Sequence, residues 1–144
     1  MKQGLFVVIC VKVRRQYHSR RGAAEKKRDA MDGFTITEKR SGDCSVLKCS
    51  GAIDYSNFNH GDDIVKELIE RGAVKLVFDL AEVSYISSSG WTVFLGNLRA
   101  VREKGGDMAL SNMAPDVKYT FKLLELDNLI DYYDTAEEAV KRMG

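Results

Sequence analysis

Apolar and polar residues alternate with two different periods along residues 34–143. A period of two predicts β-strands near residues 34–36 and 46–49, and the Ser-Gly-Asp sequence at residues 41–43 has the composition of a hairpin turn. Residues 73–80 are almost continuously apolar, which predicts a strand covered on both faces, as at the centre of an α/β sheet. Two further strands are expected at residues 107–111 and 129–133.

Apolar residues at intervals of three and four predict four helices. The first ends near Arg71, with Gly72 as its C-cap and with Asp62 and Asp63 near its positive end. The second runs from about residue 89 to residue 104 and is followed by two glycines. Two more helices are expected, one opened by Pro115 and one capped by Asp134 or Thr135.

The order of these elements predicts the fold class. A chain of 144 residues fits one domain, and it needs neither disulfides nor a metal to bury a core. A hairpin followed by alternating helices and strands predicts an α/β sandwich, in which about four helices flank a central mixed β-sheet of four to five strands. We expect this single domain to occupy residues 31–144.

Residues 1–30 differ from the rest of the chain in charge. They hold nine basic residues against Glu25 and Asp29, a net charge of +7 that leaves −6 for residues 31–144. This extension is predicted to be a disordered basic arm, or else an artefact of a start site placed upstream of Met31. A third interpretation is contact with nucleic acid or acidic lipid, although such charge runs usually stay solvated. The basic residues of that interpretation are Arg14, Arg15, Arg20, Arg21, Lys26, Lys27 and Arg28.

The cysteines exclude several classes of protein. Cys10, Cys44 and Cys49 are odd in number, lack a Cys-x-x-Cys spacing and are accompanied by only two histidines. Neither a disulfide framework nor a zinc site is supported, so we expect a reducing, cytoplasmic location without a metal or cofactor. The apolar run at residues 5–13 is shorter than the roughly 20 residues of a spanning helix, so membrane insertion is not expected.

Three serines and a glycine, Ser87, Ser88, Ser89 and Gly90, stand where an apolar stretch gives way to the second helix. The first backbone N–H groups of a helix have no partner within it, and the aligned peptide dipoles leave about half a positive charge there. A phosphate attached to one of these serines would therefore be locally favourable. A serine in this position is either a helix cap or a switch.

Enzyme signatures are weak. The serines lack the first glycine of a Gly-x-Ser-x-Gly turn, and no histidine follows His60 to act as a base in the order that α/β-hydrolases use. Neither a phosphate-binding loop of the Gly-x-x-x-x-Gly-Lys-Ser/Thr type nor a Gly-x-Gly-x-x-Gly turn is found. Asp79 and Glu82 could serve as an acid/base pair or a metal site, but such a pair is more often a cap and a solvated loop residue.

Asp54 stands where the second strand yields to the loop before the first helix. That end of the sheet should also carry the serines, so the two loops could share one surface. Asp54 either caps its loop by accepting bonds from backbone N–H groups or binds a partner, and the two roles are compatible.

Several motifs together resemble those of bacterial anti-sigma factor antagonists, which belong to the STAS domain family. The motifs occur in the same order and spacing, and the resemblance covers about residues 31–143, which implies a STAS-like sandwich. They lie at residues 51–54, 76–80, 83–90 and 105–110.

The resemblance also implies a regulatory cycle. The residue matching the family's phosphorylated serine is Ser88, and Ser89 and Gly90 match the family as well. Two neighbours differ from the family. Ser87 stands where well-studied members carry Asp, and Trp91 stands where a smaller aliphatic residue is usual. The unmodified protein would bind an anti-sigma factor that is also a serine kinase and so release a sigma factor. Phosphorylation would break that binding, and a serine phosphatase would restore it.

The resemblance implies a binding module that is not an enzyme and that makes no direct contact with nucleic acid. Its expected partner-binding surface comprises Asp54, Tyr55, Ser87, Ser88, Ser89, Gly90 and Trp91. Trp91 is either an exposed interface anchor or, from its helical phase with Leu95 and Leu98, part of the core. The alternative function is that of a STAS subunit in a lipid-transport or stress-sensing complex, with Ser88 acting only as an N-cap.

Overall fold

The computed structural model describes residues 33–144, so the predictions made for residues 1–30 lie outside the described residues. A five-stranded sheet has the order β1-β2-β3-β4-β5. The first two strands, β1 (Thr35–Ser41) and β2 (Cys44–Ile53), form an antiparallel hairpin, and every later neighbour is parallel. The remaining strands are β3 (Lys75–Ile86), β4 (Asp107–Ser111) and β5 (Asp131–Tyr133).

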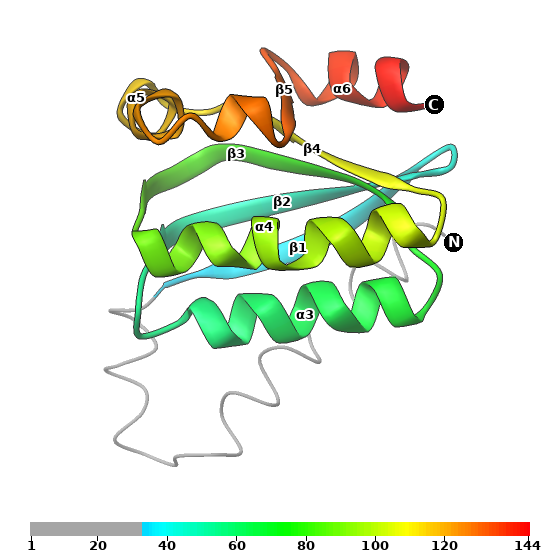
Figure 1. The fold of residues 1–144 in the computed structure, drawn as a ribbon, viewed down its shortest axis with the longest axis horizontal. Helices are drawn as coiled ribbons and strands as arrows, with labels where there is room; N and C mark the ends of the chain where they lie inside the picture. Colours follow the sequence, from blue (N-terminus) through cyan, green and yellow to red (C-terminus); the bar gives the residue numbers. More distant parts are fainter. Residues whose placement is uncertain (1–32) are drawn as a thin grey trace.

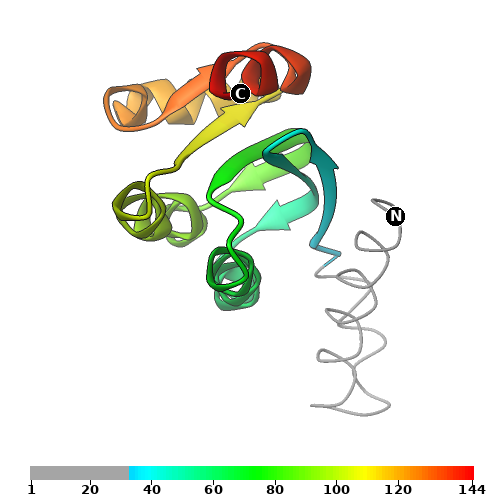
Figure 2. The same cartoon turned by 90° about the vertical axis from the view of Figure 1, so that its right-hand side faces the viewer.

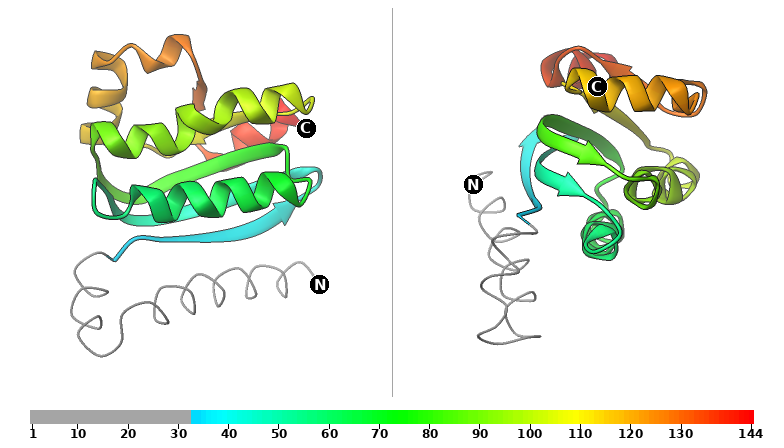
Figure 3. Two further views of the ribbon diagram at one scale, coloured as in Figure 1. Left: turned by 60° about the horizontal axis from the view of Figure 1, so that its bottom comes forward. Right: turned by 90° about the vertical axis from the view of Figure 1, so that its left-hand side faces the viewer.

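The helices form two layers about this sheet (Figure 1). Two long helices, α3 (Phe58–Glu70) and α4 (Ser88–Glu103), lie side by side on one face, as Figure 3 shows from below. The opposite face is covered by α6 (Ala136–Met143), as Figure 2 shows. The side chains of Ala136 and Ala139 pack there on Val77 and Ala109. The chain between β4 and β5 forms α5 (Pro115–Leu123) and a short 3₁₀ helix, η1 (Leu126–Asn128).

Within residues 33–144 this arrangement confirms the predicted fold class, a single α/β domain with a mixed sheet and four α-helices. The apolar run at residues 73–80 lies within β3, where Leu76, Val77, Phe78 and Leu80 are buried. Aromatic packing anchors α4 to this strand, because the Phe78 and Phe94 rings meet edge to face with centroids 4.8 Å apart.

Several predicted boundaries were wrong. The central strand does not stop at Leu80 but continues to Ile86, because Val83 and Ile86 are buried and the segment pairs with β2 beyond the end of β4. The first helix begins at Phe58, so Asp62 and its neighbour Asp63 lie in its second turn and not at its positive end. Asp62 instead accepts a hydrogen bond of 2.7 Å from Asn97 of α4.

Both hairpin strands are longer than predicted, since β1 continues to Ser41 and β2 runs from Cys44 to Ile53. The remaining boundary differences are small. The second helix begins one residue earlier than predicted, at Ser88, and the last strand is only three residues long. Thr135 is the cap of α6, since its hydroxyl accepts from the backbone N–H of Glu138 at 3.1 Å. Within residues 33–144, no helix is both long and apolar enough to cross a bilayer.

Candidate functional site

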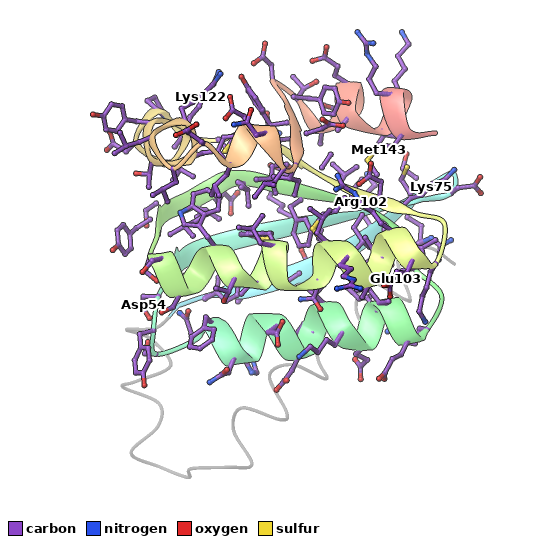
Figure 4. The ribbon with its side chains drawn as sticks, in the orientation of Figure 1. Asp54, Lys75, Arg102, Glu103, Lys122 and Met143 are labelled. Atoms are coloured by element: carbon purple, nitrogen blue, oxygen red, sulfur yellow. The ribbon has the colours of Figure 1, made fainter. Side chains whose placement is uncertain are left out.

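The carboxyl ends of β2 and β3 bring the two predicted loops together. Ile53 pairs with Ile86 at the end of the parallel ladder, and the next amide, that of Ser87, donates to the Ile53 carbonyl at 2.9 Å. Asp54 and Ser87 therefore leave neighbouring strands at the same edge of the sheet. In Figure 4 the labelled Asp54 lies beside the N-terminal end of α4.

Ser87, and not Ser88, is the N-cap of α4. Its backbone is extended, with φ −76° and ψ 172°, and its Oγ accepts a hydrogen bond of 3.0 Å from the Gly90 N–H. Ser88 is the first residue of the helix, and its side chain is exposed. The interpretation of Ser88 as an N-cap was therefore wrong, because β3 runs on to Ile86 and leaves Ser87 as the only residue between strand and helix.

Gly90 lets this helix start lie directly on the strand ends. A Cβ atom at this position would lie 2.7 Å from the Ile53 carbonyl oxygen and 2.9 Å from side-chain carbons of both Ile53 and Ile86. Real Cβ atoms do not approach other atoms this closely, so any larger residue would push the first turn of α4 away from the sheet. The glycine thus fixes the position of the serines relative to the Asp54 loop.

Asp54 organises its own loop. Its Oδ1 accepts hydrogen bonds from the backbone N–H of Ser56 at 2.8 Å and from the Ser56 hydroxyl at 2.6 Å, an Asx-type turn. The side chain of Asn57 ties this turn down, since its Oδ1 accepts from the Asp54 N–H at 2.9 Å and its Nδ2 donates to Ala52 at 2.8 Å. The capping role of Asp54 is therefore present, and its carboxylate remains partly exposed beside the serines.

Two tyrosines present aromatic rings near this edge of the sheet. Tyr55 was predicted as a site residue and is 79% exposed, with its ring centroid 6.0 Å from that of Phe58. Tyr85 was not predicted, although it is 56% exposed and its backbone pairs with Ala52, just before the Asp54 loop. The sequence did contain an indication of the exposure of Tyr85. Neighbouring residues of a strand point to opposite faces, so in a β3 that continues to the buried Ile86, Tyr85 points toward solvent.

Trp91 does not belong to the exposed surface. It is 3% exposed, and its ring centroid lies 6.0 Å from that of Phe94 and 5.7 Å from that of Phe121 in α5. Of the two roles considered for Trp91, the structure supports the core role, and the exposed interface anchor was wrong. Its large ring fills the space between the first turn of α4 and α5.

The site offers a hydroxyl surface without metal ligands or an evident general base. Residues 85–92 contain no charged side chain, and Asp54 brings a carboxylate to the same edge of the sheet. Within residues 33–144, no three His, Cys, Asp or Glu side chains are grouped as a metal site would need. Asp79 and Glu82 have separate partners, because Asp79 Oδ1 accepts from Ala81 and Asn112 whereas Glu82 forms a 3.2 Å ion pair with Lys48.

Sequence and structure comparisons then assign the family. The model of the STAS domain matches residues 35–139, which is most of the chain and nearly all of the described fold. The chain belongs to the STAS domain family.

Curated relatives of this STAS domain carry related names. The anti-sigma F factor antagonist of Paenibacillus polymyxa is 27% identical over 103 residues, which cover 68% of this chain and 85% of the relative. The anti-sigma-B factor antagonist of Bacillus subtilis is 34% identical over 74 residues, which cover 51% of this chain and 67% of the relative.

Solved structures show the same fold. An anti-sigma factor antagonist from Mycobacterium paratuberculosis superposes with a TM-score of 0.68 at 23% identity, covering 78% of this STAS domain chain and 95% of the other. The Bacillus cell fate determinant SpoIIAA in its phosphorylated form superposes with a TM-score of 0.59 at 22% identity, covering 77% and 99% of the two chains.

Proposed function

We propose that this STAS domain is an anti-sigma factor antagonist that is switched by phosphorylation of Ser88. The unmodified form binds an anti-sigma factor that is also a serine kinase, and a sigma factor is thereby released. The observation that carries the proposal is the division of roles between adjacent serines. Ser87 uses its hydroxyl to cap α4, whereas Ser88 exposes its hydroxyl one residue later. The names of the curated relatives support the same function.

The position of Ser88 suits a phosphate both sterically and electrostatically. The N–H groups of the first helical turn point out of the helix end, and the macrodipole favours negative charge there. A phosphate adds about −1.5 to −2 charges at neutral pH, so it can sit at this helix end without refolding the protein. At a surface that has bound a partner through the free hydroxyl, the same charge introduces repulsion and a desolvation penalty.

The loss of binding free energy that a switch requires is modest. A loss of about 3 kcal/mol of binding free energy weakens an interface more than a hundredfold. Residues 85–92 carry no charge, so the phosphate would add about −1.5 to −2 charges there, beside the single negative charge of Asp54. A partner surface that is complementary to the unmodified site is therefore poorly suited to the phosphorylated site.

The proposal includes a second partner and a location. A serine phosphatase that removes the phosphate would restore binding, and the protein would act in the cytoplasm as a binding module without a cofactor, without enzymatic activity and without direct contact with nucleic acid. The competing assignment is a STAS subunit of a lipid-transport or stress-sensing complex that has no phosphorylation switch.

Paired affinity captures from native cytosol test the function. Wild type and Ser88→Asp serve as baits, with Ser88→Ala and Ser87→Ala as matched neutral variants, and the captured proteins are identified by mass spectrometry. We expect wild type and Ser88→Ala to capture a serine-kinase-type anti-sigma factor and Ser88→Asp to lose it. Equal capture by wild type and Ser88→Asp, or partners drawn only from a transport complex, would sink the assignment.

A further inference from the structure

A shallow hollow of about 500 Å³ lies beside the C-terminal half of α4. One wall is α4 itself, and the other is Leu129, which follows η1 and is 53% exposed. The two walls are fixed to each other, because Arg102 donates from Nη2 to the Leu129 carbonyl at 3.1 Å and from Nε to Asp107 at 2.9 Å. The lining residues are Leu95, Leu98, Arg99, Arg102, Glu103 and Leu129.

The hollow lies on the same face of α4 as Ser88. Successive α-helical residues are about 100° apart, so Leu95, Arg99 and Arg102 all point within roughly 40° of the direction of Ser88. Thr92 is exposed between them, so no buried residue interrupts this face. With a rise of about 1.5 Å per residue, Leu95 lies roughly 10 Å and Arg102 roughly 21 Å along the axis from Ser88. Figure 4 shows Asp54 at one end of α4 and Arg102 with Glu103 at the other.

A single partner bound at Ser88 would cover this distance. A standard protein interface buries roughly 800 Å² on each side, which corresponds to a patch on the order of 30 Å across. The α4 face from Ser88 to the hollow fits inside one such patch. The hollow is therefore continuous with the surface on which the proposed switch operates.

The chemistry of the hollow selects an apolar occupant. Three of its six lining residues are leucines, and its charged residues already have partners, since Arg99 pairs with Glu103 at 3.0 Å and Arg102 pairs with Asp107. Arg99 has a side chain that is 89% exposed and could exchange its partner for a carboxylate at the edge of an interface. An aliphatic or aromatic side chain would bury the leucines without leaving these charges unpaired.

We infer that the anti-sigma factor that binds at Ser88 also inserts an apolar side chain into the hollow between α4 and Leu129. This inference rests on the proposed function and adds a second contact that phosphorylation does not touch. The interface then has a switch at one end of α4 and a constant anchor at the other.

The test compares two exposed leucines in the whole protein. Leu129→Glu places a charge in the hollow, whereas Leu123→Glu makes the same change on α5 at a residue that is 65% exposed and outside the hollow. Binding is measured by calorimetry with the anti-sigma factor that wild type captures, after circular dichroism and thermal melting have shown that each variant is folded. Arg99→Glu is the second variant. The side chain of Arg99 is 89% exposed, so this test holds even if the fold does not accept a charge at Leu129.

We expect Leu129→Glu to weaken binding at least tenfold, Arg99→Glu severalfold, and Leu123→Glu less than twofold. Binding by Leu129→Glu and Arg99→Glu within twofold of wild type would overturn the inference while leaving the switch intact. A wild type that binds no anti-sigma factor, or a Ser88→Asp variant that binds as well as wild type, would remove the proposed function itself. A change in the sedimentation of isolated Leu129→Glu would assign the hollow to a second copy of this chain and overturn the inference.

Discussion

Replacing Ser87 and Ser88 separately by alanine distinguishes the helix cap from the candidate switch. In Ser87→Ala the Gly90 N–H loses the hydroxyl oxygen that accepts its hydrogen bond at 3.0 Å. Loss of a serine N-cap costs about 0.5–2 kcal/mol, and because Gly90 is buried we expect a value near the middle of this range, about 1 kcal/mol. In Ser88→Ala an exposed residue in the first turn is replaced by the best helix former, so the free energy of unfolding should change by less than about 0.5 kcal/mol.

The assay is urea unfolding of the two variants followed by circular dichroism, with thermal melting as a second readout. For a domain of this size, a loss of about 1 kcal/mol lowers Tm by roughly 4 °C. Ser87→Asp is the matched control, because aspartate is an equally good N-cap and should restore the stability of wild type. A Ser88→Ala variant as destabilised as Ser87→Ala would refute the division of roles between the two serines and, with it, the observation on which the proposed switch rests.

Three further predictions concern the packing around the site. Gly90→Ala should destabilise the fold by about 2 kcal/mol or more, because its Cβ would meet the Ile53 carbonyl at 2.7 Å, and a variant with unchanged urea midpoint would contradict this packing. Trp91 is 3% exposed, so its fluorescence should resist quenching by iodide until the protein unfolds. Quenching in the native protein would contradict the burial of the indole. Burial raises the pKa of the Cys49 thiol above its ordinary value of 9.0, so only the unfolded chain ionises this group as the pH rises past 9.0. Stability should therefore fall above pH 9.0 and less steeply in Cys49→Ala, and equal slopes in the two proteins would exclude this cause.

The order and type of the elements could be predicted from sequence because each apolar pattern is local. The run at residues 73–80 and the stripe of Phe94, Leu98 and Val101 specify one strand and one helix that pack on each other, and both are in the core. The errors arose where pairing between strands that are distant in the sequence determines the bounds of an element. β3 continues to Ile86 because β2 supplies a partner strand beyond the end of β4, and no property of residues 81–86 alone reveals that partner.

The candidate site shows the same limit at the scale of single residues. The sequence placed Asp54 and the serines at one edge of the sheet, and the ladder between Ile53 and Ile86 brings them together. It could not assign the cap, because three consecutive serines have equal capping propensity and only the exact end of β3 selects Ser87. Trp91 was ambiguous for a related reason, since its burial depends on Phe121 in a helix 30 residues later.

Four residues at the start of α4, Ser87, Ser88, Gly90 and Trp91, have different tasks in the structure. Ser87 caps the helix, Gly90 sets its contact with the strands, and Trp91 fills the core, so each of these positions is constrained by folding. Ser88 meets none of these constraints, and its exposed hydroxyl can be modified while the cap, the close packing and the core stay in place. A modification whose effect must be confined to a partner surface needs such a position, because a change that removes the Ser87 cap or adds bulk at Gly90 or Trp91 would alter stability as well as binding.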